Sequence, residues 1–103
     1  MEPVKKPEAC TNIEEIRDAI DKIDFEIIDL FARRYDYIKE IVKFKSGEEG
    51  IIARERKEQV LQQRRAWAEE MGLDPGLYEE VFRLLIDKNI EIQFEIYNST
   101  KKH

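Results

Sequence analysis

The stretch that decides the fold is FARRYDYIKEIVKFK, which runs from Phe31 to Lys45. It continues an apolar series that repeats every seven residues: Ile13, Ile20, Ile27, then Arg34, then Ile41. This spacing places the side chains on one face of an α-helix. An arginine therefore stands where the pattern predicts isoleucine, and Lys45 follows Ile41 by one further helical turn.

The helix that contains this stretch is predicted to be unusually long. Thr11 and Glu14 form a T-x-x-E capping box, which favours a helix start. No Gly or Pro follows until Gly47, so we expect about 33 helical residues and a length of about 50 Å. A compact domain of about 100 residues has a radius of gyration of only about 13 Å. A homodimer, in which two such helices cover each other's apolar faces, is therefore predicted.

Two further helices are predicted after the segment SGEEG. The second covers about residues 52–71 and ends before Gly72, and the third covers about residues 75–97 after the pair Asp74-Pro75. The fold is thus expected to be all-α, with three helices per chain. The predicted organisation is an N-terminal arm, a helical domain and a C-terminal tail: residues 1–10, 11–98 and 99–103.

Composition and charge argue against several classes of function. The net charge of −5 provides no overall basic field to attract nucleic acid or an anionic membrane. Cys10 is the only cysteine, so no intrachain disulfide can form. No apolar run resembles a signal peptide or approaches the roughly 20 residues that span a bilayer. We expect a cytoplasmic protein without nucleic-acid or membrane partners.

Residues that commonly carry enzyme chemistry are few. The only histidine is His103, next to two lysines at the end of the chain. The sequence therefore offers no Cys/His or Ser/His/Asp nucleophile, no cluster of metal ligands and no Gly-rich phosphate loop. An enzyme with this sequence is expected to work without a nucleophile, a metal or a cofactor.

Three cations border or enter the apolar stripe of the first helix: Arg17, Arg34 and Lys45. Long cationic side chains can cover apolar surface while their charged ends reach water. Arg34, in the middle of the stripe, is harder to explain, because an unpaired buried charge costs several kcal/mol. An ion pair across a dimer interface would satisfy it, and so would a bound anion.

The spacing of these cations favours a shared anion site. In a continuous helix, Arg34 and Lys45 are about 16–17 Å apart along the axis, so both could hold one small molecule. Arg17 lies about 25 Å from Arg34, too far to join them within one chain. In an antiparallel dimer the partner subunit's Arg17 would enter each of two symmetric sites.

The later helices add three polar residues that could face this site. Arg54 shares a helix face with apolar residues further along, and Asn89 and Gln93 lie one turn apart. Alternatively, Arg54 is a surface residue and the two amides are ordinary core or surface polar groups. A cationic site with amide donors and no general base suits a dicarboxylate whose reaction develops negative charge on an oxygen.

Four segments resemble, in order and spacing, the all-helical chorismate mutase family, which includes isochorismate-pyruvate lyase. They are IRDAIDKID (16–24), LFARRYDYIKEIVKFK (30–45), IIARERKEQVL (51–61) and IEIQ (90–93). The resemblance covers about residues 7–97. It implies an intertwined homodimer of three-helix chains.

The resemblance also implies residue roles. Arg17 matches the arginine donated to the partner's site, and Arg34 matches the arginine that pairs with a substrate carboxylate in its own chain. Lys45 matches the lysine that contacts the ether oxygen and a carboxylate, and Gln93 matches a donor to the same ether oxygen. Arg54 matches the second-helix arginine of the mutases.

Two positions depart from the mutase pattern. Asn89 stands where mutases carry a small hydroxyl residue, and Ile51 stands where they carry an acid that contacts the substrate's ring hydroxyl. Glu48 or Glu49 is a candidate replacement for that acid. The PEAC segment and the first helix resemble the lyase branch, whereas Arg54 resembles the mutases.

Both family reactions are pericyclic and need no acid, base or cofactor. The resemblance implies catalysis by Lys45, Gln93 and Arg34, with rearrangement of chorismate to prephenate as the main activity. Cleavage of isochorismate to salicylate and pyruvate is the alternative. A non-catalytic helical dimer is the alternative from another class, although apolar residues at these three positions would stabilise such a scaffold better.

Overall fold

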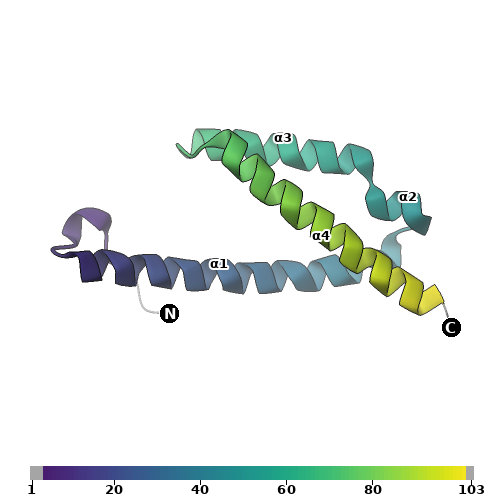
Figure 1. Cartoon of the computed structure of the whole chain (residues 1–103), viewed down its shortest axis with the longest axis horizontal. Coiled ribbons are helices and arrows are strands. Elements are labelled where there is room, and N and C mark those ends of the chain that lie inside the picture. Colours follow the sequence, from purple (N-terminus) through teal and green to yellow (C-terminus); the bar gives the residue numbers. More distant parts are fainter. Residues whose placement is uncertain (1–3, 102–103) are drawn as a thin grey trace. The chain divides into compact units, whose positions relative to one another are not determined.

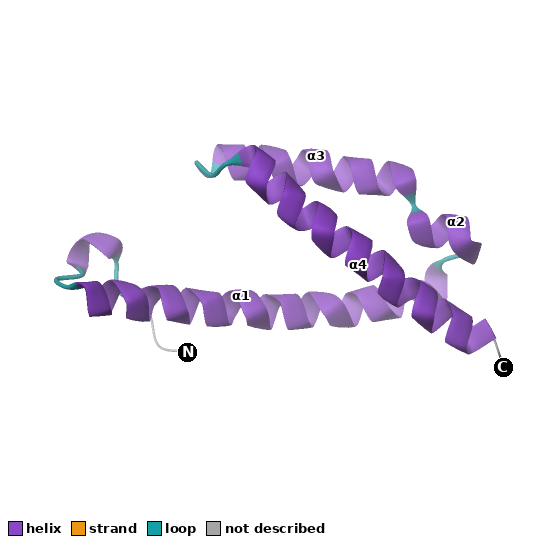
Figure 2. Cartoon of the chain, viewed as in Figure 1, coloured by secondary structure: helices purple, strands orange, loops and turns teal. Residues whose placement is uncertain are grey.

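The structure, a computed structural model, describes residues 4–101, and every regular element in that range is a helix (Figures 1 and 2). The prediction of an all-α fold is confirmed. Residues 1–3 of the predicted arm and residues 102–103 of the predicted tail lie outside the described residues. The chain forms two compact units, one ending at Tyr37 and one beginning at Ile38, and each is described by itself.

The first unit consists of a short 3₁₀ helix, η1 (Pro7–Ala9), and most of the long helix α1 (Ile13–Ile41). The predicted N-terminal arm contains a 3₁₀ turn that begins at Pro7, whose ring presets the helical φ. α1 has 29 residues, which corresponds to about 44 Å. The prediction of a very long first helix is confirmed.

The N-terminus of α1 is capped one residue later than the T-x-x-E pattern indicates. The backbone N–H of Glu15 donates to Asn12 Oδ1 at 2.9 Å, so Asn12 is the capping residue. Thr11 instead donates its hydroxyl to the Glu15 carboxylate at 2.7 Å, and Lys5 pairs with the same carboxylate. Thr11 therefore contacts the Glu15 side chain in the first turn of α1 and does not cap the helix backbone.

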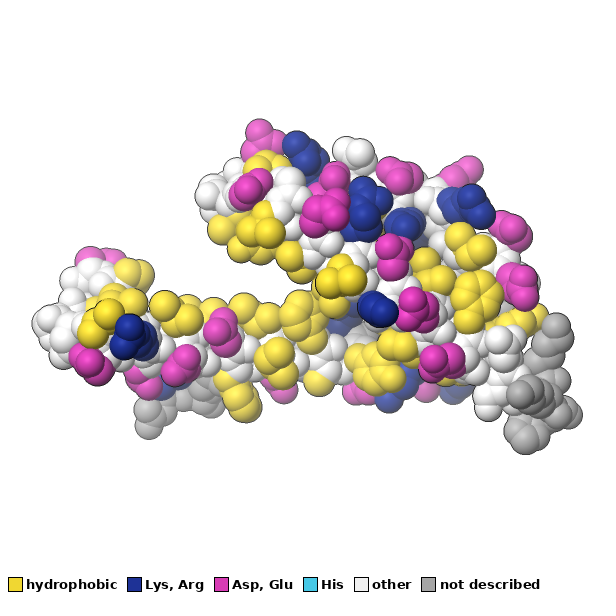
Figure 3. Space-filling view, viewed as in Figure 1, with side chains coloured by type: hydrophobic (Ala, Val, Ile, Leu, Met, Phe, Trp, Pro, Cys, Tyr) yellow, Lys and Arg dark blue, Asp and Glu magenta, His cyan; other side chains and the backbone are white. Residues whose placement is uncertain are grey.

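α1 buries none of its residues. The isoleucines of the seven-residue series are all substantially exposed: Ile13 55%, Ile20 50%, Ile27 42% and Ile41 42%. On the face shown in Figure 3, apolar side chains follow the length of α1. The amphipathic stripe that the sequence predicts is present on α1, and its isoleucines are exposed in the part of the chain that the structure describes.

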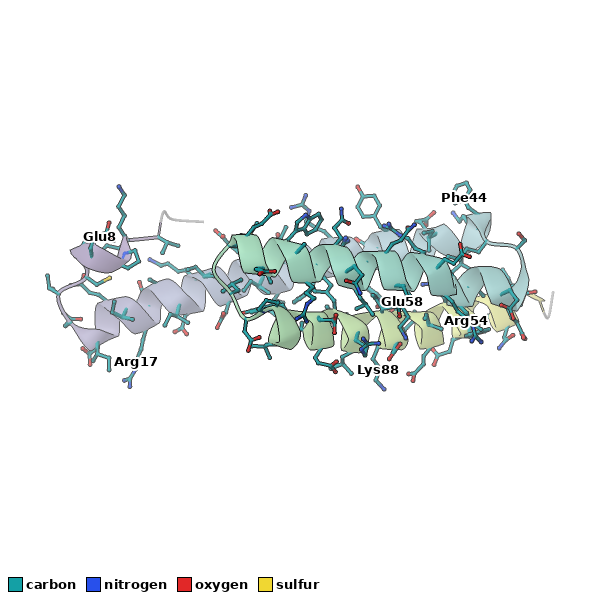
Figure 4. All side chains as sticks on the ribbon, turned by 90° about the horizontal axis from the view of Figure 1, so that it is seen from above. Glu8, Arg17, Phe44, Arg54, Glu58 and Lys88 are labelled. Carbon is teal, nitrogen blue, oxygen red and sulfur yellow. The ribbon has the colours of Figure 1, made fainter. Side chains whose placement is uncertain are left out.

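The second unit is built on a hairpin of α3 (Arg54–Glu70) and α4 (Pro75–Lys101), which lie side by side in Figures 1 and 4. α3 ends at Glu70, Gly72 then adopts a left-handed φ of 76°, and the Leu73 N–H donates to the Ala68 carbonyl at 2.8 Å. Asp74 then caps α4, because its Oδ1 accepts from the Gly76 N–H at 3.0 Å. Both predicted helix boundaries are confirmed.

The junction between α1 and α3 differs from the prediction. α1 is followed by η2 (Val42–Phe44), and GEEGII forms a short helix, α2 (Gly47–Ile52), in a segment expected to be a break. Ala53 has φ 43° and ψ 58°, a left-handed conformation that separates α2 from α3. The predicted second helix therefore begins at Arg54, and the third continues to Lys101 instead of ending near Tyr97.

The core of the second unit lies where α2 and α3 contact α4. Its buried apolar residues are Val42, Ile51, Val60, Leu61 and Ala68. Contacts on the surface hold α3 against α4: Lys57 pairs with Asp87 at 2.7 Å, Arg65 with Glu79 at 3.9 Å, and the Arg64 guanidinium lies over the rings of Trp67 and Phe82. These contacts link α3 to α4 across the surface of the second unit. Between residues 4 and 101, no helix combines the length and apolar character that crossing a bilayer requires.

Candidate active site

The second unit brings Lys45 and Gln93 together although 48 positions separate them in the sequence. Lys45 Nζ donates to Gln93 Oε1 at 2.7 Å and to the Ile51 carbonyl at 3.4 Å. Lys45 was expected on the stripe of the first helix, but it follows η2 in an extended conformation with φ −98° and ψ 137°. The estimate of 16–17 Å between Lys45 and Arg34 along one helix therefore does not apply.

The contact with Lys45 orients the Gln93 amide. An ammonium group has donors only, so the carbonyl oxygen of the amide must face it. The Gln93 side chain is 4% exposed, which leaves it little freedom to turn over. Its Nε2 group consequently points away from Lys45 and remains a donor. The pair thus offers two different donors, an ammonium and an amide.

The surroundings of Lys45 disfavour the charged form of its side chain. Partial burial lowers the pKa of the Lys45 ammonium below its usual value. Both of its described oxygen contacts are neutral carbonyl groups. A bound anion would add the opposite charge that these contacts do not supply.

Asn89 lies one helical turn before Gln93 on α4. Its side chain is 9% exposed, and its Nδ2 atom is buried without a hydrogen-bond partner among the described residues. Most buried polar groups in proteins are paired, so an unpaired buried donor requires an explanation. The prediction that Asn89 belongs with Gln93 in the site is consistent with this position, and its role stays a prediction.

Ile51 contributes to this cluster through its backbone. Its side chain is 1% exposed and belongs to the core, while its carbonyl accepts from Lys45. No acid therefore occupies the position at which the mutase pattern expects one. Nothing in the sequence signals the carbonyl contact, because a backbone acceptor is common to every residue type.

Arg54 has no hydrogen bond to Lys45 or Gln93 among those described. It is the first residue of α3, exposed, and labelled in Figure 4. It lines an open depression together with Glu49, Ala53, Glu55 and others. Glu49 thus lines the same depression as Arg54, and Glu48 and Glu49, both in α2, are exposed. The substrate-binding role of Arg54 stays a prediction.

Arg17 and Arg34 both lie on α1 in the first unit. Arg17 is exposed near the beginning of the helix (Figure 4), and Arg34 is half-buried. Partial burial lowers the pKa of the Arg34 guanidinium. About 25 Å of helix separates the two, so they cannot hold one small molecule in the same chain. Their roles in substrate binding stay predictions.

Comparison with known proteins identifies the family. Residues 16–94 match the chorismate mutase type II family. The chain is 41% identical over 98 residues to an isochorismate pyruvate lyase of Pseudomonas aeruginosa, covering 95% of this chain and 97% of that protein. It is 38% identical over 73 residues to the T-protein of Haemophilus influenzae, which covers 69% of this chain but 19% of that protein. A T-protein of Enterobacter agglomerans is 38% identical over 69 residues, which are 66% of this chain and 18% of that protein. The chain belongs to the chorismate mutase type II family.

Proposed function

We propose that the chain is an isochorismate-pyruvate lyase, which cleaves isochorismate to salicylate and pyruvate. Two findings support this choice within the family. The similarity to the Pseudomonas lyase extends over 97% of that protein. In addition, the Ile51 side chain is buried and apolar, so it cannot accept the ring-hydroxyl hydrogen bond that the mutase pattern assigns to an acid there. The burial of Ile51 is the observation that carries the proposal.

The Lys45–Gln93 pair provides the catalytic device. In the lyase reaction the bond between the ring and the enolpyruvyl oxygen breaks, and one ring hydrogen passes to the methylene carbon. The oxygen gains negative charge in the transition state. The Lys45 ammonium and the Gln93 Nε2 group can donate to it, and one preorganised donor of this kind is worth about 3–4 kcal/mol. No proton donor or base is needed for this step.

The two carboxylates of the substrate need cationic partners. We assign Arg34 of the same chain and Arg17 of the partner subunit to this role, with Arg54 as a further contact. A site of this composition requires a homodimer. The exposure of 42–55% along the isoleucine series of α1 supports one, because a second copy of the same helix would cover that stripe.

Chorismate mutase activity is the second candidate. The Lys45–Gln93 contact suits either reaction, because the ether bond breaks in both. Arg54, which matches the mutase arginine, favours the rearrangement. Chorismate rearrangement is the main activity that the sequence pattern predicts. The similarity over 97% of the Pseudomonas lyase and the apolar Ile51 support the lyase, which we therefore propose first. The family match makes the chain an enzyme of one of these two kinds, so the non-catalytic alternative is set aside.

The test supplies isochorismate and chorismate separately to the purified chain and identifies the products. We expect salicylate and pyruvate in equal amounts from isochorismate, with slower formation of prephenate from chorismate. The Lys45→Met variant should lose both activities. Prephenate as the main product would instead support the mutase, and inactivity on both substrates would refute the catalytic reading.

A complementation experiment tests the shared site. The variants Arg17→Ala and Arg34→Ala should each be inactive as homodimers. After equal mixing with subunit exchange, half of the dimers are mixed, and each mixed dimer has one site with both arginines. About one quarter of the wild-type activity should return. Mixed dimers that form but stay inactive would contradict the donation of Arg17 across the interface.

A further inference from the structure

Ala53, between α2 and α3, is the one residue other than glycine with a positive φ among the residues that the structure describes. Its φ of 43° and ψ of 58° are left-handed, a conformation that strains any L-residue with a Cβ atom. The local sequence does not favour it, because alanine is the residue that most favours continuation of a helix. Strained backbone persists where the surrounding structure imposes it, and it concentrates at functional sites. The conformation of Ala53 therefore calls for a functional explanation.

The break at Ala53 changes which donor the Ile51 carbonyl can bond. In a continuous helix this carbonyl would accept the backbone N–H of Glu55, four residues later. The left-handed residue separates α2 from α3, so that bond belongs to neither helix. The Ile51 carbonyl accepts instead from Lys45 Nζ at 3.4 Å. The break thus releases a backbone acceptor for the ammonium group.

Two further features make α2 a support for Lys45. A Cβ atom added to Gly50 would lie 3.7 Å from Lys45 Cβ, so the backbone of α2 packs directly against the lysine. The Ile51 side chain, which is 1% exposed, anchors the same turn of α2 in the core. The ammonium therefore lies between two described acceptors, the Ile51 carbonyl and Gln93 Oε1. Together these acceptors restrict the rotamers of a long side chain that is otherwise flexible.

We propose that Ala53 is a positioning residue, whose left-handed conformation leaves the Ile51 carbonyl free to hold the Lys45 ammonium in its catalytic orientation. The inference rests on the proposed function, since it takes this ammonium to act on the ether oxygen of the substrate. Ala53 touches no reacting atom and acts only through Lys45. Its strained backbone lowers the stability of the fold, while the oriented ammonium raises the rate of the reaction.

Ala53→Val tests the backbone conformation, because positive φ is especially unfavourable for a β-branched residue. Ala53 lines an open depression, so the larger side chain has room. The kcat for isochorismate should fall about 10-fold, with a smaller change in KM, because the ammonium is misplaced. Ala53→Gly, the conservative variant, should retain most of the wild-type kcat, since glycine adopts the left-handed conformation without strain. Ala66→Val, at an exposed alanine of α3, is the matched control and should leave kcat within about twofold of wild type.

The same substitution in a Lys45→Met background separates positioning from a structural role. Without the ammonium, Ala53→Val should change the remaining kcat by less than about twofold, because the group that it positions is gone. The melting temperature should fall by the same amount in both backgrounds. A residue that only stabilises the fold would lower kcat equally with and without Lys45.

The outcomes separate this inference from the proposed function. An unchanged kcat in Ala53→Val, in a protein whose wild type is active, would overturn the inference alone. Equal fold losses of kcat in the two backgrounds would also overturn it, since Ala53 would then act independently of Lys45. If Ala53→Val does not fold, Ala53→Gly decides: a folded protein that retains kcat supports the inference, and a loss of about 10-fold overturns it. A wild-type chain that acts on neither isochorismate nor chorismate would overturn the proposed function and this inference with it.

Discussion

The contact between Lys45 and Gln93 can be tested by removing each partner separately and then both. Lys45→Met keeps the length of the stem but removes the ammonium, leaving Gln93 Oε1 without the donor that lies at 2.7 Å. Gln93 is 4% exposed, so the orphaned oxygen is not solvated and should destabilise the fold by about 1–3 kcal/mol. Gln93→Met leaves the partly buried ammonium with only the Ile51 carbonyl, at 3.4 Å, and should cost a similar amount.

The double variant removes both polar groups at once. It should cost less than the sum of the single variants, by a coupling of about 1–3 kcal/mol. Urea denaturation followed by far-UV circular dichroism, at one fixed protein concentration, measures all four free energies of unfolding. Lys43→Met is the matched control, since Lys43 is exposed and pairs only locally with Glu40.

The same variants test the catalytic role of the pair. Each single variant should lower kcat by about 100- to 1,000-fold. The double variant should be little worse, because Lys45 and Gln93 stabilise the same ether oxygen and act as a unit. Lys43→Met should retain the wild-type kcat. Additive free energies of unfolding, within about 0.5 kcal/mol, would refute the coupling. A Lys45→Met variant with normal kcat would refute the catalytic assignment.

Four further predictions concern pH and helix ends. Burial lowers the pKa of Lys45, so the anion-binding ammonium should lose its proton at a pH below the usual 10.5. The value of kcat/KM should therefore fall as pH rises, with an alkaline midpoint below 10.5. In the same pH range the unfolded chain binds more protons than the folded chain. The Lys45 contribution to the free energy of unfolding, measured as the difference from Lys45→Met, should therefore increase with pH. A contribution that decreases with pH would contradict this prediction. Asp74→Ala removes the cap that accepts from the Gly76 N–H and should cost about 1 kcal/mol in urea denaturation, and no loss would argue against the cap. Ala53→Gly should stabilise the fold by about 1 kcal/mol, because φ 43° strains an alanine but not a glycine. A lower melting temperature would count against the left-handed conformation of Ala53 between α2 and α3.

The helical class and most boundaries could be predicted from the sequence because strong local signals mark them. The apolar period identifies α1, Gly72 follows the end of α3, and Asp74-Pro75 begins α4. The joint at Ala53 could not be predicted, since alanine is the residue that most favours helix continuation and has no preference for the left-handed region. The short helix α2 was missed for a related reason, because the glycines of GEEGII indicate a break.

The candidate site was predictable only in part. Lys45 and Gln93 were identified as members of one site, and the structure brings them within hydrogen-bond distance. The reasoning that placed Lys45 on a continuous helix was wrong, since the helix ends before it. The Ile51 carbonyl and the unpaired state of Asn89 depend on how α2 and α4 pack, which no local pattern encodes. Arg17, Arg34 and Arg54 stay predictions that rest on the family pattern.

A competition between the two substrates tests the proposed activity most directly. Equal concentrations of isochorismate and chorismate are supplied together, and the initial amounts of salicylate and prephenate are measured. Their ratio equals the ratio of the two kcat/KM values, independently of the fraction of active protein. Salicylate should exceed prephenate, with one pyruvate released for each salicylate. Prephenate in excess would contradict the lyase assignment and the significance attached to Ile51.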